Sequence, residues 1–523
     1  MLFRSMIKTF NIAGPCRPRK HYMLQTRERC QGLIELIDEE QYFVIHAARQ
    51  TGKTTLLLEL TRQLNEGGEY YALYCSLETV QGIDDPKEGI PAILKVIKTR
   101  LKFHQTLKRY PFAEKVDYAD FNVALMEAFT YFCEELDKPL VVLFDEVDCL
   151  SNGTLISFLR QLRNGYINRS LMPFVHSLAL VGMRNIRDYK GKIREGRDTL
   201  GSSSPFNIVK TSKTLRNFTP DEITKLYAQH TQATGQVFSQ PVVSNVYHYT
   251  QGQPWLVNAI ACEIVEQILQ KKEEILPEHV ESAVQTLIFR RDTHIDSLME
   301  RLKEARVQRI VEPVILGKSA SFGSLDDDYQ YVLDLGLLRY AAKQLLPANP
   351  IYAEVIIRTL SSQVQMEIDE PGYLPDSLTY MRTGKLDMKR LLSDFQQFWR
   401  ENSESWTKRY QYVEAAPHLT LQAFLQRIVN SGGVVTREMA AGSKRLDLYI
   451  QYQGINYPIE LKIRYSEKTC QEGLKQLADY MDKLSCQKGW LIIFDKRKSI
   501  SWEEKIFWRS FSVGEKTIHV VGV

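Results

Sequence analysis

One short stretch, Tyr42–Thr55 (YFVIHAARQTGKTT), constrains the fold of this chain more than any other segment. Its apolar beginning, Tyr42–Ala47, has the length and composition of a buried strand. A polar loop follows at once, and residues Thr54–Leu60 favour a helix. A buried strand that leads through a tight loop into a helix is typical of α/β folds with a parallel sheet, so we expect that class of fold.

The loop ends in Gly52-Lys53-Thr54, the tail of the phosphate-binding P-loop pattern G-x-x-x-x-G-K-[ST]. Gly52 lets the backbone curl so that N–H groups and the helix N-terminus point at phosphate oxygens. Lys53 would reach the β- and γ-phosphates, and the Thr54 hydroxyl would ligate Mg²⁺. Ala47 replaces the first glycine of the pattern, and its small side chain should preserve the bend. The expected nucleotide-binding residues here are Ala47, Arg49, Gln50, Thr51, Gly52, Lys53, Thr54 and Thr55.

A second apolar run, Leu140–Phe144, ends in two acids, Asp145 and Glu146. Its five apolar residues predict a central parallel strand. Asp145 would hold Mg²⁺ directly or through water, beside the nucleotide. Glu146 would orient and deprotonate the attacking water as general base. The two motifs together predict an ATP site with Mg²⁺.

Three more short runs predict strands, Tyr70–Cys75, Ser177–Met183 and Phe206–Val209. Arg184 follows the second of these and could sense the γ-phosphate from the neighbouring strand. Arginines on or after the intervening helix could act as fingers towards a neighbouring subunit, or could form a solvated helix face. These arginines are Arg160, Arg163 and Arg169.

The segments HAARQTGKTT, LFDEVD and LVGMR, in this order, resemble the AAA-like P-loop ATPases of the AAA+/STAND group. The opening FNIAGPCRPRKHYML is similar to the start of bacterial AAA-like domain ATPases. The resemblance implies ATP hydrolysis, homo-oligomers formed through the ATPase domain, and an extra strand between the P-loop strand and the acidic strand. It also implies a helical lid, which residues 216–270 fit. Gly252 and Pro254 would form its G-x-P element, with Pro254 near the nucleotide, unless they only begin a helix.

At 523 residues the chain is too long for one core, so several domains are expected. The predicted organisation is an ATPase domain (1–215), a lid (216–280), a winged-helix-like module (281–370), a linker (371–410) and a C-terminal domain (411–523). The module contains the amphipathic segment Gln330–Tyr340 but no concentrated basic helix, which favours packing over DNA reading.

A second set of charged residues lies near the C-terminus, where Arg445–Tyr465 predicts two strands around a turn. Glu460 and Lys462 are two positions apart on the second strand, so their side chains emerge from the same face. Strand pairing would bring Asp447 beside them. Carboxylates and the Leu461 carbonyl make a hard oxygen site that suits Mg²⁺ or Mn²⁺. A neighbouring lysine can activate water or stabilise developing charge.

This arrangement, Asp447 followed by Glu460-Leu-Lys462, resembles the core of the PD-(D/E)xK nucleases. The resemblance implies a restriction-endonuclease-like α/β domain, with an acid on its first helix and a polar residue on the following helix. Glu414 and Gln476 fit those two positions, and Glu438 is an additional acid. The Pro of the motif is absent, because Leu446 stands there. The catalytic residues that this resemblance implies are Asp447, Glu460, Lys462, Gln476 and Glu414, whereas Glu146 is the candidate catalytic residue of the ATP site.

An alternative for the same stretch is an exposed hairpin with alternating charges on a small sheet. The apolar residues of both strands speak against it, because charges on a central strand need a reason. These residues are Tyr449, Ile459, Leu461 and Ile463.

The favoured function is an ATPase that controls a nuclease, acting on nucleic acid, with DNA preferred over RNA. A role in prokaryotic defence or mobile-element biology rests on analogy alone. A nucleotide-driven switch whose C-terminal domain binds nucleic acid or a partner without cleaving is the alternative. A translocating motor ranks last, because no further helicase motif is present.

Composition restricts partners and compartment only loosely. The net charge is +4, and residues 411–523 carry 16 Lys and Arg against 12 Asp and Glu, which is the whole excess. Eight scattered cysteines predict reduced thiols in a cytoplasmic protein without a zinc site. No apolar run approaches the ~18 residues that a membrane helix needs, so no membrane partner is expected.

Overall fold

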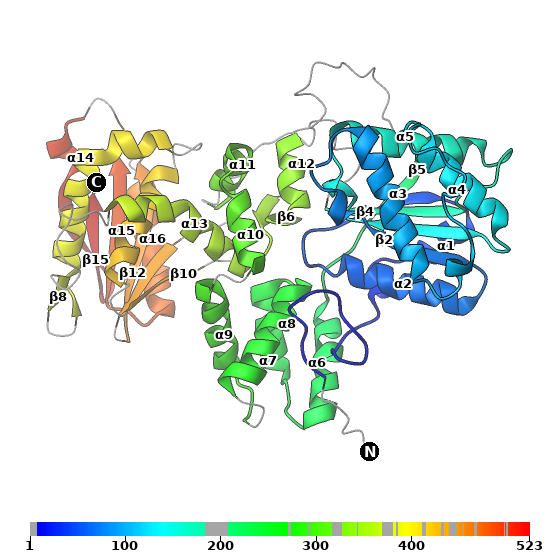
Figure 1. Cartoon of the computed structure of the whole chain (residues 1–523). Coiled ribbons are helices and arrows are strands. Elements are labelled where there is room, and N and C mark those ends of the chain that lie inside the picture. The colour runs from blue at the N-terminus through cyan, green and yellow to red at the C-terminus, as the bar shows by residue number, and fades with distance from the viewer. Residues whose placement is uncertain are drawn as a thin grey trace. The chain divides into compact units, whose positions relative to one another are not determined.

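The computed structural model describes residues 8–183, 208–269, 273–290, 293–315, 327–341, 344–368, 380–382, 385–409, 415–429, 433–438, 447–452, 454–464, 468–495, 497 and 500–523 (Figure 1). The chain divides into two compact units. One contains residues 1–294 and 325–337, and the other contains residues 295–324 and 338–523.

The first unit is built on a five-stranded parallel sheet with strand order β2-β3-β4-β1-β5. The strands are β1 (Tyr42–His46), β2 (Tyr71–Ser76), β3 (Leu140–Asp145), β4 (Ser177–Gly182) and β5 (Val209–Thr214). β4 lies between the P-loop strand β1 and the acidic strand β3, which confirms the extra strand that the resemblance implies. The parallel order brings the carboxyl ends of β1 and β3 to the same edge of the sheet.

Helices cover both faces of this sheet. α1 (Leu33–Asp38) and α2 (Lys53–Gly67) bury apolar residues in one core layer. α3 (Pro86–Lys102), α4 (Ala124–Glu135) and α5 (Asn152–Asn168) bury theirs in the other. Two buried faces explain why β1, β3 and β4 are almost continuously apolar.

The last strand of this sheet, β5, lies later in the sequence than the prediction puts it. β5 begins at Val209, so it shares one residue with the predicted strand Phe206–Val209. Its residues, VKTSKT, pair with β1 alone at the edge of the sheet. An edge strand needs fewer apolar residues than a central one, so the apolar pattern did not mark its true position.

The predicted lid region is helical, and it contains α6 (Pro220–Thr234), α7 (Gln240–Thr250), α8 (Pro254–Cys262) and the π-helical turn η6 (Glu263–Ile268). A capping box starts α6, in which the Thr219 hydroxyl accepts from the backbone N–H of Glu222 and the Glu222 carboxylate accepts from that of Thr219. α9 (Pro277–Arg290) follows.

Helices and a small hairpin occupy residues 293–368. α10 (Thr293–Arg301), α11 (Ala305–Ile315) and α12 (Asp327–Asp334) precede the antiparallel strands β6 (Leu338–Ala341) and β7 (Gln344–Pro347), and α13 (Pro350–Ile368) follows. The division into compact units falls within the predicted module 281–370. The winged-helix assignment therefore stays a prediction.

The second unit contains a six-stranded mixed sheet with order β10-β11-β12-β13-β15-β14. The strands are β10 (Gly433–Glu438), β11 (Asp447–Tyr452), β12 (Ile455–Arg464), β13 (Lys488–Asp495), β14 (Phe507–Val513) and β15 (Lys516–Gly522). α16 (Lys468–Lys483) packs apolar residues on one face, against β13 and β15. β8 (Met381–Arg382) and β9 (Lys385–Leu386) form a separate two-stranded pair. α17 (Trp502–Lys505) precedes β14.

The predicted linker 371–410 contains a long helix, α14 (Met388–Arg409), that packs on this sheet. Its Phe395 and Trp399 contact the ring of Phe494 on β13, with centroid distances of 6.1 and 5.3 Å. Phe395 also meets Phe424 of α15 (Ala415–Val429) at 5.2 Å. The helix is thus part of the C-terminal core, because its apolar side would otherwise face water.

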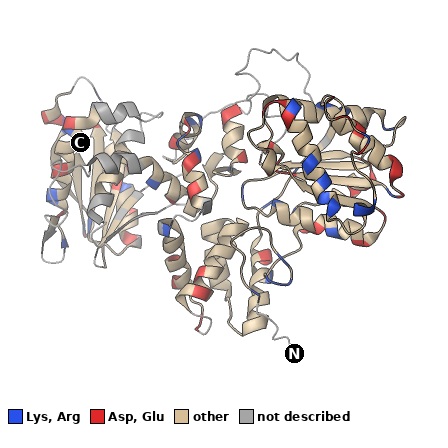
Figure 2. Ribbon diagram, in the orientation of Figure 1, with Lys and Arg blue, Asp and Glu red and all other residues tan. Residues whose placement is uncertain are grey.

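Charged residues of both signs are scattered along the helices that are drawn in colour (Figure 2). Within the described residues, no helix is both long and apolar enough to cross a membrane.

Candidate functional site

The P-loop curls through two left-handed residues between β1 and α2. Gln50 has φ +56° and Gly52 has φ +95°, the conformation for which glycine is preferred. The curl buries Lys53, whose Nζ donates to the carbonyl oxygens of Ala47 at 2.9 Å and Ala48 at 3.0 Å. Burial lowers the pKa of Lys53, although nearby acids such as Glu146 act in the opposite direction. Phosphate oxygens would be stronger acceptors for this ammonium group than backbone carbonyls are.

Ala47 tolerates a Cβ where the motif usually has glycine. It is buried, and its φ is not among the positive values of the described residues. Its N–H donates to the carbonyl of Gly182 at the end of β4, at 3.3 Å. The bend therefore does not depend on glycine at this position.

Thr54 and Asp145, the two predicted Mg²⁺ ligands, lie against each other. The Thr54 hydroxyl donates to Oδ2 of Asp145 at 2.7 Å, and the Tyr74 hydroxyl donates to the same atom at 3.1 Å. Oδ1 of Asp145 accepts from the backbone N–H of Glu146 at 3.1 Å. A hydroxyl and a carboxylate are oxygen donors of the kind that Mg²⁺ takes, so these residues fit that ion. Among the described side chains, no group of three or more His, Cys, Asp or Glu could hold a metal ion.

Glu146, the predicted general base, follows directly after β3. Its φ of +56° turns the chain sharply into a short 3₁₀ turn. Burial raises the pKa of Glu146, and the negative charge of Asp148 raises it further. Asp148 is held by the end of β4, where its Oδ2 accepts from the N–H of Met183 at 3.4 Å.

Asp148→Asn should move the acid limb of the pH profile of ATP hydrolysis to lower pH. The ionised Asp148 disfavours the ionised form of Glu146, so removing that charge lowers the pKa of Glu146. Asparagine keeps an oxygen for the Met183 N–H. The measurement is kcat against pH, with the exposed Glu114→Gln as control. An acid limb that does not move would contradict Glu146 as the base.

Arg29 connects the P-loop to the lid, and sequence reasoning missed it. Its side chain is 3% exposed, and its Nη2 donates to the carbonyl of Thr51 at 2.8 Å. Nε and Nη2 also donate to the carbonyl of Arg216, at 2.8 and 2.6 Å. The guanidinium lies 4.6 Å from the ring centre of Phe218. Burial lowers the pKa of Arg29 to about 10, so it stays a cation at neutral pH.

The segment before α1 reaches both the P-loop helix and the lid. The N–H of Cys16 donates to Oγ1 of Thr55 at 3.1 Å. The Trp255 indole on α8 donates to the carbonyl of Ile12 at 2.8 Å. The N–H of Met23 donates to Oε1 of Gln229 on α6 at 3.3 Å, and Nε2 of Gln229 donates to the carbonyl of Met23 at 2.9 Å. The segment before α1 therefore connects the P-loop helix α2 with helices α6 and α8.

Gly252 has a geometric reason to be glycine. Its φ is +73°, and a Cβ would lie 1.9 Å from the carbonyl oxygen of Phe218. The N–H of Phe218 donates to the carbonyl of Gly252 at 2.8 Å, so the two backbones are in direct contact. The approach of Pro254 to the nucleotide stays a prediction.

Gly252→Ala should therefore lower the free energy of unfolding by about 2–3 kcal/mol, because backbone strain is combined with a backbone clash. Gly235→Ala is a matched control: its φ is +80°, but nothing lies within 4 Å of the added Cβ. The control should lose only about 1 kcal/mol. Urea unfolding measures both, and equal losses would contradict the close contact.

The structure describes only some of the predicted arginines. Arg184 lies outside the described residues. Nη1 of Arg169 donates to the carbonyl of Glu40 at 2.8 Å and Nη2 lies 3.5 Å from its carboxylate, so Glu40 holds Arg169 within this chain. The finger role of Arg160, Arg163 and Arg169 stays a prediction.

In the second unit, three predicted residues come together on one face of the sheet. Glu460 and Lys462 on β12 are each 1% exposed. Nζ of Lys462 donates to Oε1 of Glu460 and to Oε1 of Gln476 on α16. A Cβ on Gly473 of α16 would lie only 3.2 Å from Cγ of Lys462, so the glycine permits this close packing. β12 lies between β11 and β13, and the exposed-hairpin alternative is therefore wrong.

Strand register places two more acids in the same cross-strand row. Leu448 pairs with Ile459, and the same register continued by one residue brings Asp447 opposite Glu460. Glu438 pairs with Asp447 from the other side. Only the backbone of Asp447 and Glu438 is described. Glu414 lies outside the described residues, and metal ligation by the Leu461 carbonyl stays a prediction.

A buried ion pair on a central strand is seldom present for stability alone. Removing two charges from water costs about as much as their attraction returns, and an apolar pair is often as stable. A buried acid paired with a lysine in this way is a candidate functional site. Of the predicted side-chain ligands here, the structure describes the carboxylate of Glu460, an oxygen donor of the kind that hard divalent cations take.

Comparison with solved structures finds distant similarity to P-loop ATPases. The Walker-type ATPase PABY2304 of Pyrococcus abyssi is 13% identical, with 66% of this chain and 99% of that chain covered and a TM-score of 0.47. Cdc6p from Pyrobaculum aerophilum is 15% identical over 62% of this chain and 88% of that chain, with a TM-score of 0.34. The RuvB Holliday junction branch migration motor of Thermotoga maritima is 14% identical over 60% and 88%, with a TM-score of 0.32.

No curated protein matches the chain in sequence. The AAA-like domain family matches residues 21–357, more than half of the chain. The match includes β1 with its P-loop, β3 with Asp145, and the lid helices, and it ends before the C-terminal sheet. The chain belongs to the AAA-like domain family.

Proposed function

We propose that this protein hydrolyses ATP at the P-loop and that its nucleotide state controls a metal-dependent nuclease in the C-terminal sheet. Family membership and the Lys53, Thr54 and Asp145 contacts support the first part. The buried Glu460–Lys462 pair with Gln476 is the observation that carries the second.

At the ATP site, each residue has a distinct task. Lys53 exchanges its carbonyl partners for phosphate oxygens and balances their charge. Thr54 and Asp145 would hold Mg²⁺, which neutralises phosphate charge when bound. Glu146, with its pKa raised by burial, accepts a proton from the attacking water.

At the second site, Glu460 and Asp447 would hold Mg²⁺ or Mn²⁺, which supplies Lewis-acid stabilisation when bound. Lys462 lies beside Glu460 and stabilises negative charge on the scissile phosphate. Gln476 accepts a hydrogen bond from the Lys462 ammonium and so orients it.

The proposed substrate is nucleic acid, with DNA favoured, and the proposed assembly is a homo-oligomer through the ATPase domain. Arg29 links the P-loop to the lid and is a route by which bound nucleotide changes lid position. A role in prokaryotic defence or mobile-element biology is part of the proposal by analogy alone.

The test is cleavage of plasmid DNA, linear DNA and single-stranded RNA with Mg²⁺ or Mn²⁺, with and without ATP. Asp447→Asn and Gln476→Ala should abolish or strongly reduce cleavage and leave ATP hydrolysis near wild type. Lys475→Ala, exposed on the same helix as Gln476, should cleave normally. Intact ATP hydrolysis without cleavage of any substrate would favour the nucleotide-driven switch instead.

A further inference from the structure

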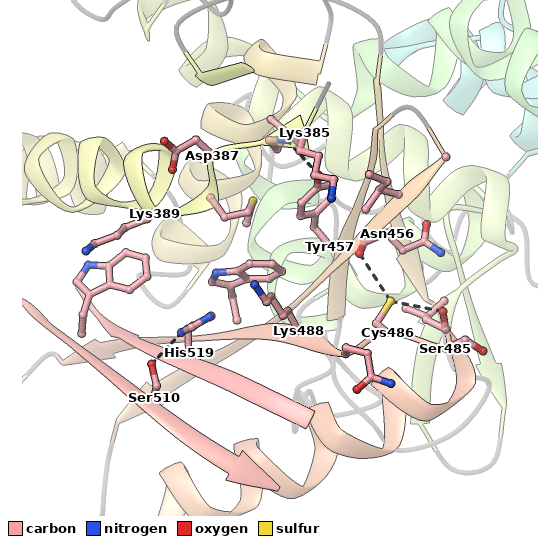
Figure 3. A pocket seen from close by; sticks show the side chains of 18 residues that line it. Lys385, Asp387, Lys389, Asn456, Tyr457, Ser485, Cys486, Lys488, Ser510 and His519 are labelled. Atoms are coloured by element: carbon pink, nitrogen blue, oxygen red, sulfur yellow. Dashed lines mark hydrogen bonds between the residues drawn. The ribbon is translucent and has the colours of Figure 1, made fainter. Parts of the chain in front are cut away.

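A separate hollow of about 850 Å³ lies in the second unit (Figure 3). Its walls come from β9, the start of α14, the turn between β11 and β12, the first residues of β12, the loop after α16, and strands β13, β14 and β15. A volume of this size is in the range of sites that hold small molecules of nucleotide size, and it is too small for a duplex.

The hollow is on the opposite face of the sheet from Glu460 and Lys462. Ile459, Trp490 and His519 are in register across β12, β13 and β15, so they share one face. Glu460 is the next residue on β12 and faces the other way, towards α16. The hollow therefore cannot be a part of the proposed cleavage site.

An aromatic wall with a fixed orientation lines the hollow. The ring centres of Tyr457 and Trp490 are 5.8 Å apart, and those of Trp490 and His519 are 6.0 Å apart. Trp508 is half-buried, and its indole donates to Oε1 of Gln396 at 2.8 Å. Gln396 is itself buried and donates to the carbonyl of Gly522 at 2.6 Å. The Trp508 ring is thus held in place before any ligand arrives, which lowers the entropy lost on stacking.

The rim of the hollow is mainly basic. Lys385, Lys389 and Lys488 are exposed, and Asp387 is the one acid among the lining residues. Oδ1 of Asp387 accepts from the N–H of Arg390, as the cap of α14. Figure 3 shows the three lysines around the hollow. An anion that enters would meet several ammonium groups within a small volume.

Polar groups complete the lining. Nδ1 of His519 and Oγ of Ser510 are 2.9 Å apart, within hydrogen-bonding distance. Burial lowers the pKa of His519, as does the charge of Lys488, so at neutral pH its ring is a hydrogen-bonding group more than a cation.

We propose that this hollow binds one nucleotide unit, with the base on the Trp508 ring and the phosphate among the lysines. Base–aromatic stacking tolerates any base, and lysines contact phosphate without reading sequence. The unit could come from a free nucleotide or from the end or a looped-out position of a nucleic-acid strand. The shared chemistry is a planar base with a 5′-phosphate.

The test measures binding of a short fluorescein-labelled oligothymidylate to the full chain by anisotropy, in EDTA so that no metal-dependent cleavage occurs. All proteins carry Lys53→Met, which removes phosphate binding at the P-loop. Lys389→Glu with Lys488→Glu should weaken binding about tenfold or more, because phosphate contacts are lost. Trp508→Ala should weaken it about tenfold through lost stacking.

The matched control reverses two exposed charges outside the hollow, Lys475→Glu with Arg509→Glu, and so changes the net charge equally. The control variant should bind the oligonucleotide within about twofold of the parent affinity. It changes the long-range electrostatic attraction but none of the contacts in the hollow. Competition by thymidine 5′-monophosphate at the same site would assign free nucleotide as the ligand. If the lysine variant binds more weakly but thymidine 5′-monophosphate does not compete, the ligand is assigned as a nucleic-acid strand.

Equal affinities for the parent, the lysine variant and the control would overturn the proposal. So would equal losses in the lysine variant and the control. Because binding is measured without metal, the result is independent of whether the Glu460 site cleaves.

Discussion

Replacing Lys53 by methionine is expected to abolish ATP hydrolysis and at the same time to stabilise the nucleotide-free protein. The ammonium group lies on the carbonyls of Ala47 and Ala48, where it is buried. It would otherwise balance the charge of the transferring phosphoryl group, so the rate should fall by about 10²–10³-fold or more.

The stability gain follows from the same burial. The folded state lowers the pKa of Lys53, so the unfolded chain binds the proton more tightly. At neutral pH the charged lysine therefore costs stability, and methionine should raise the free energy of unfolding by about 1 kcal/mol. The gain should shrink as pH rises through the lowered pKa of Lys53, because the lysine then becomes neutral in the folded state.

Two measurements check this result, steady-state ATP hydrolysis and urea unfolding without nucleotide. The exposed Lys87→Met is the control, and it should change neither quantity noticeably. Normal hydrolysis by Lys53→Met would refute the P-loop assignment. A loss of stability would show that Lys53 is not the buried, desolvated group described above.

Lys462→Met is expected to destabilise the second unit strongly. It removes the cation that donates to the carboxylate of Glu460, which is 1% exposed. Breaking a buried ion pair by removing one partner costs about 3–5 kcal/mol, because the remaining charge stays desolvated. The double variant Glu460→Gln with Lys462→Met should recover most of that loss, since it leaves no charge at either position.

Urea unfolding followed by tryptophan fluorescence measures these effects, because Trp490 lies on the neighbouring strand β13. Lys475→Met, exposed on α16, should change stability by less than about 0.5 kcal/mol. If the single and double variants are equally destabilised, the energetic coupling between Glu460 and Lys462 is absent. Cleavage should be lost in both variants even where the double variant is stable.

Much of the ATPase unit was predictable from the sequence. Local signals were enough for β1, β2, β3 and β4, because strands buried on both faces are apolar along their length. Gly52 and Lys53 were predictable because a phosphate-binding turn requires particular residues at fixed spacing. The pair Glu460 and Lys462 was predictable because a strand has a period of two.

Other features had no local signal. Arg29 is one basic residue among many in the sequence, and only its contacts with Thr51 and Arg216 distinguish it. Tyr74 would have passed for an ordinary core residue, but its hydroxyl meets Asp145. The hollow in the second unit combines residues from segments more than 100 positions apart in the chain, such as Lys385 and His519.

Neighbouring residues encode the P-loop strand and helix, the acidic strand and the Glu-x-Lys strand, so the sequence was enough to predict each of them. Which distant side chains meet became known only from the folded chain: Thr54 meets Asp145, Lys462 meets Gln476, and Arg29 meets the carbonyl of Arg216. Backbone conformation and periodicity are local properties, whereas burial and hydrogen bonding between segments depend on how the whole sheet and its helices pack.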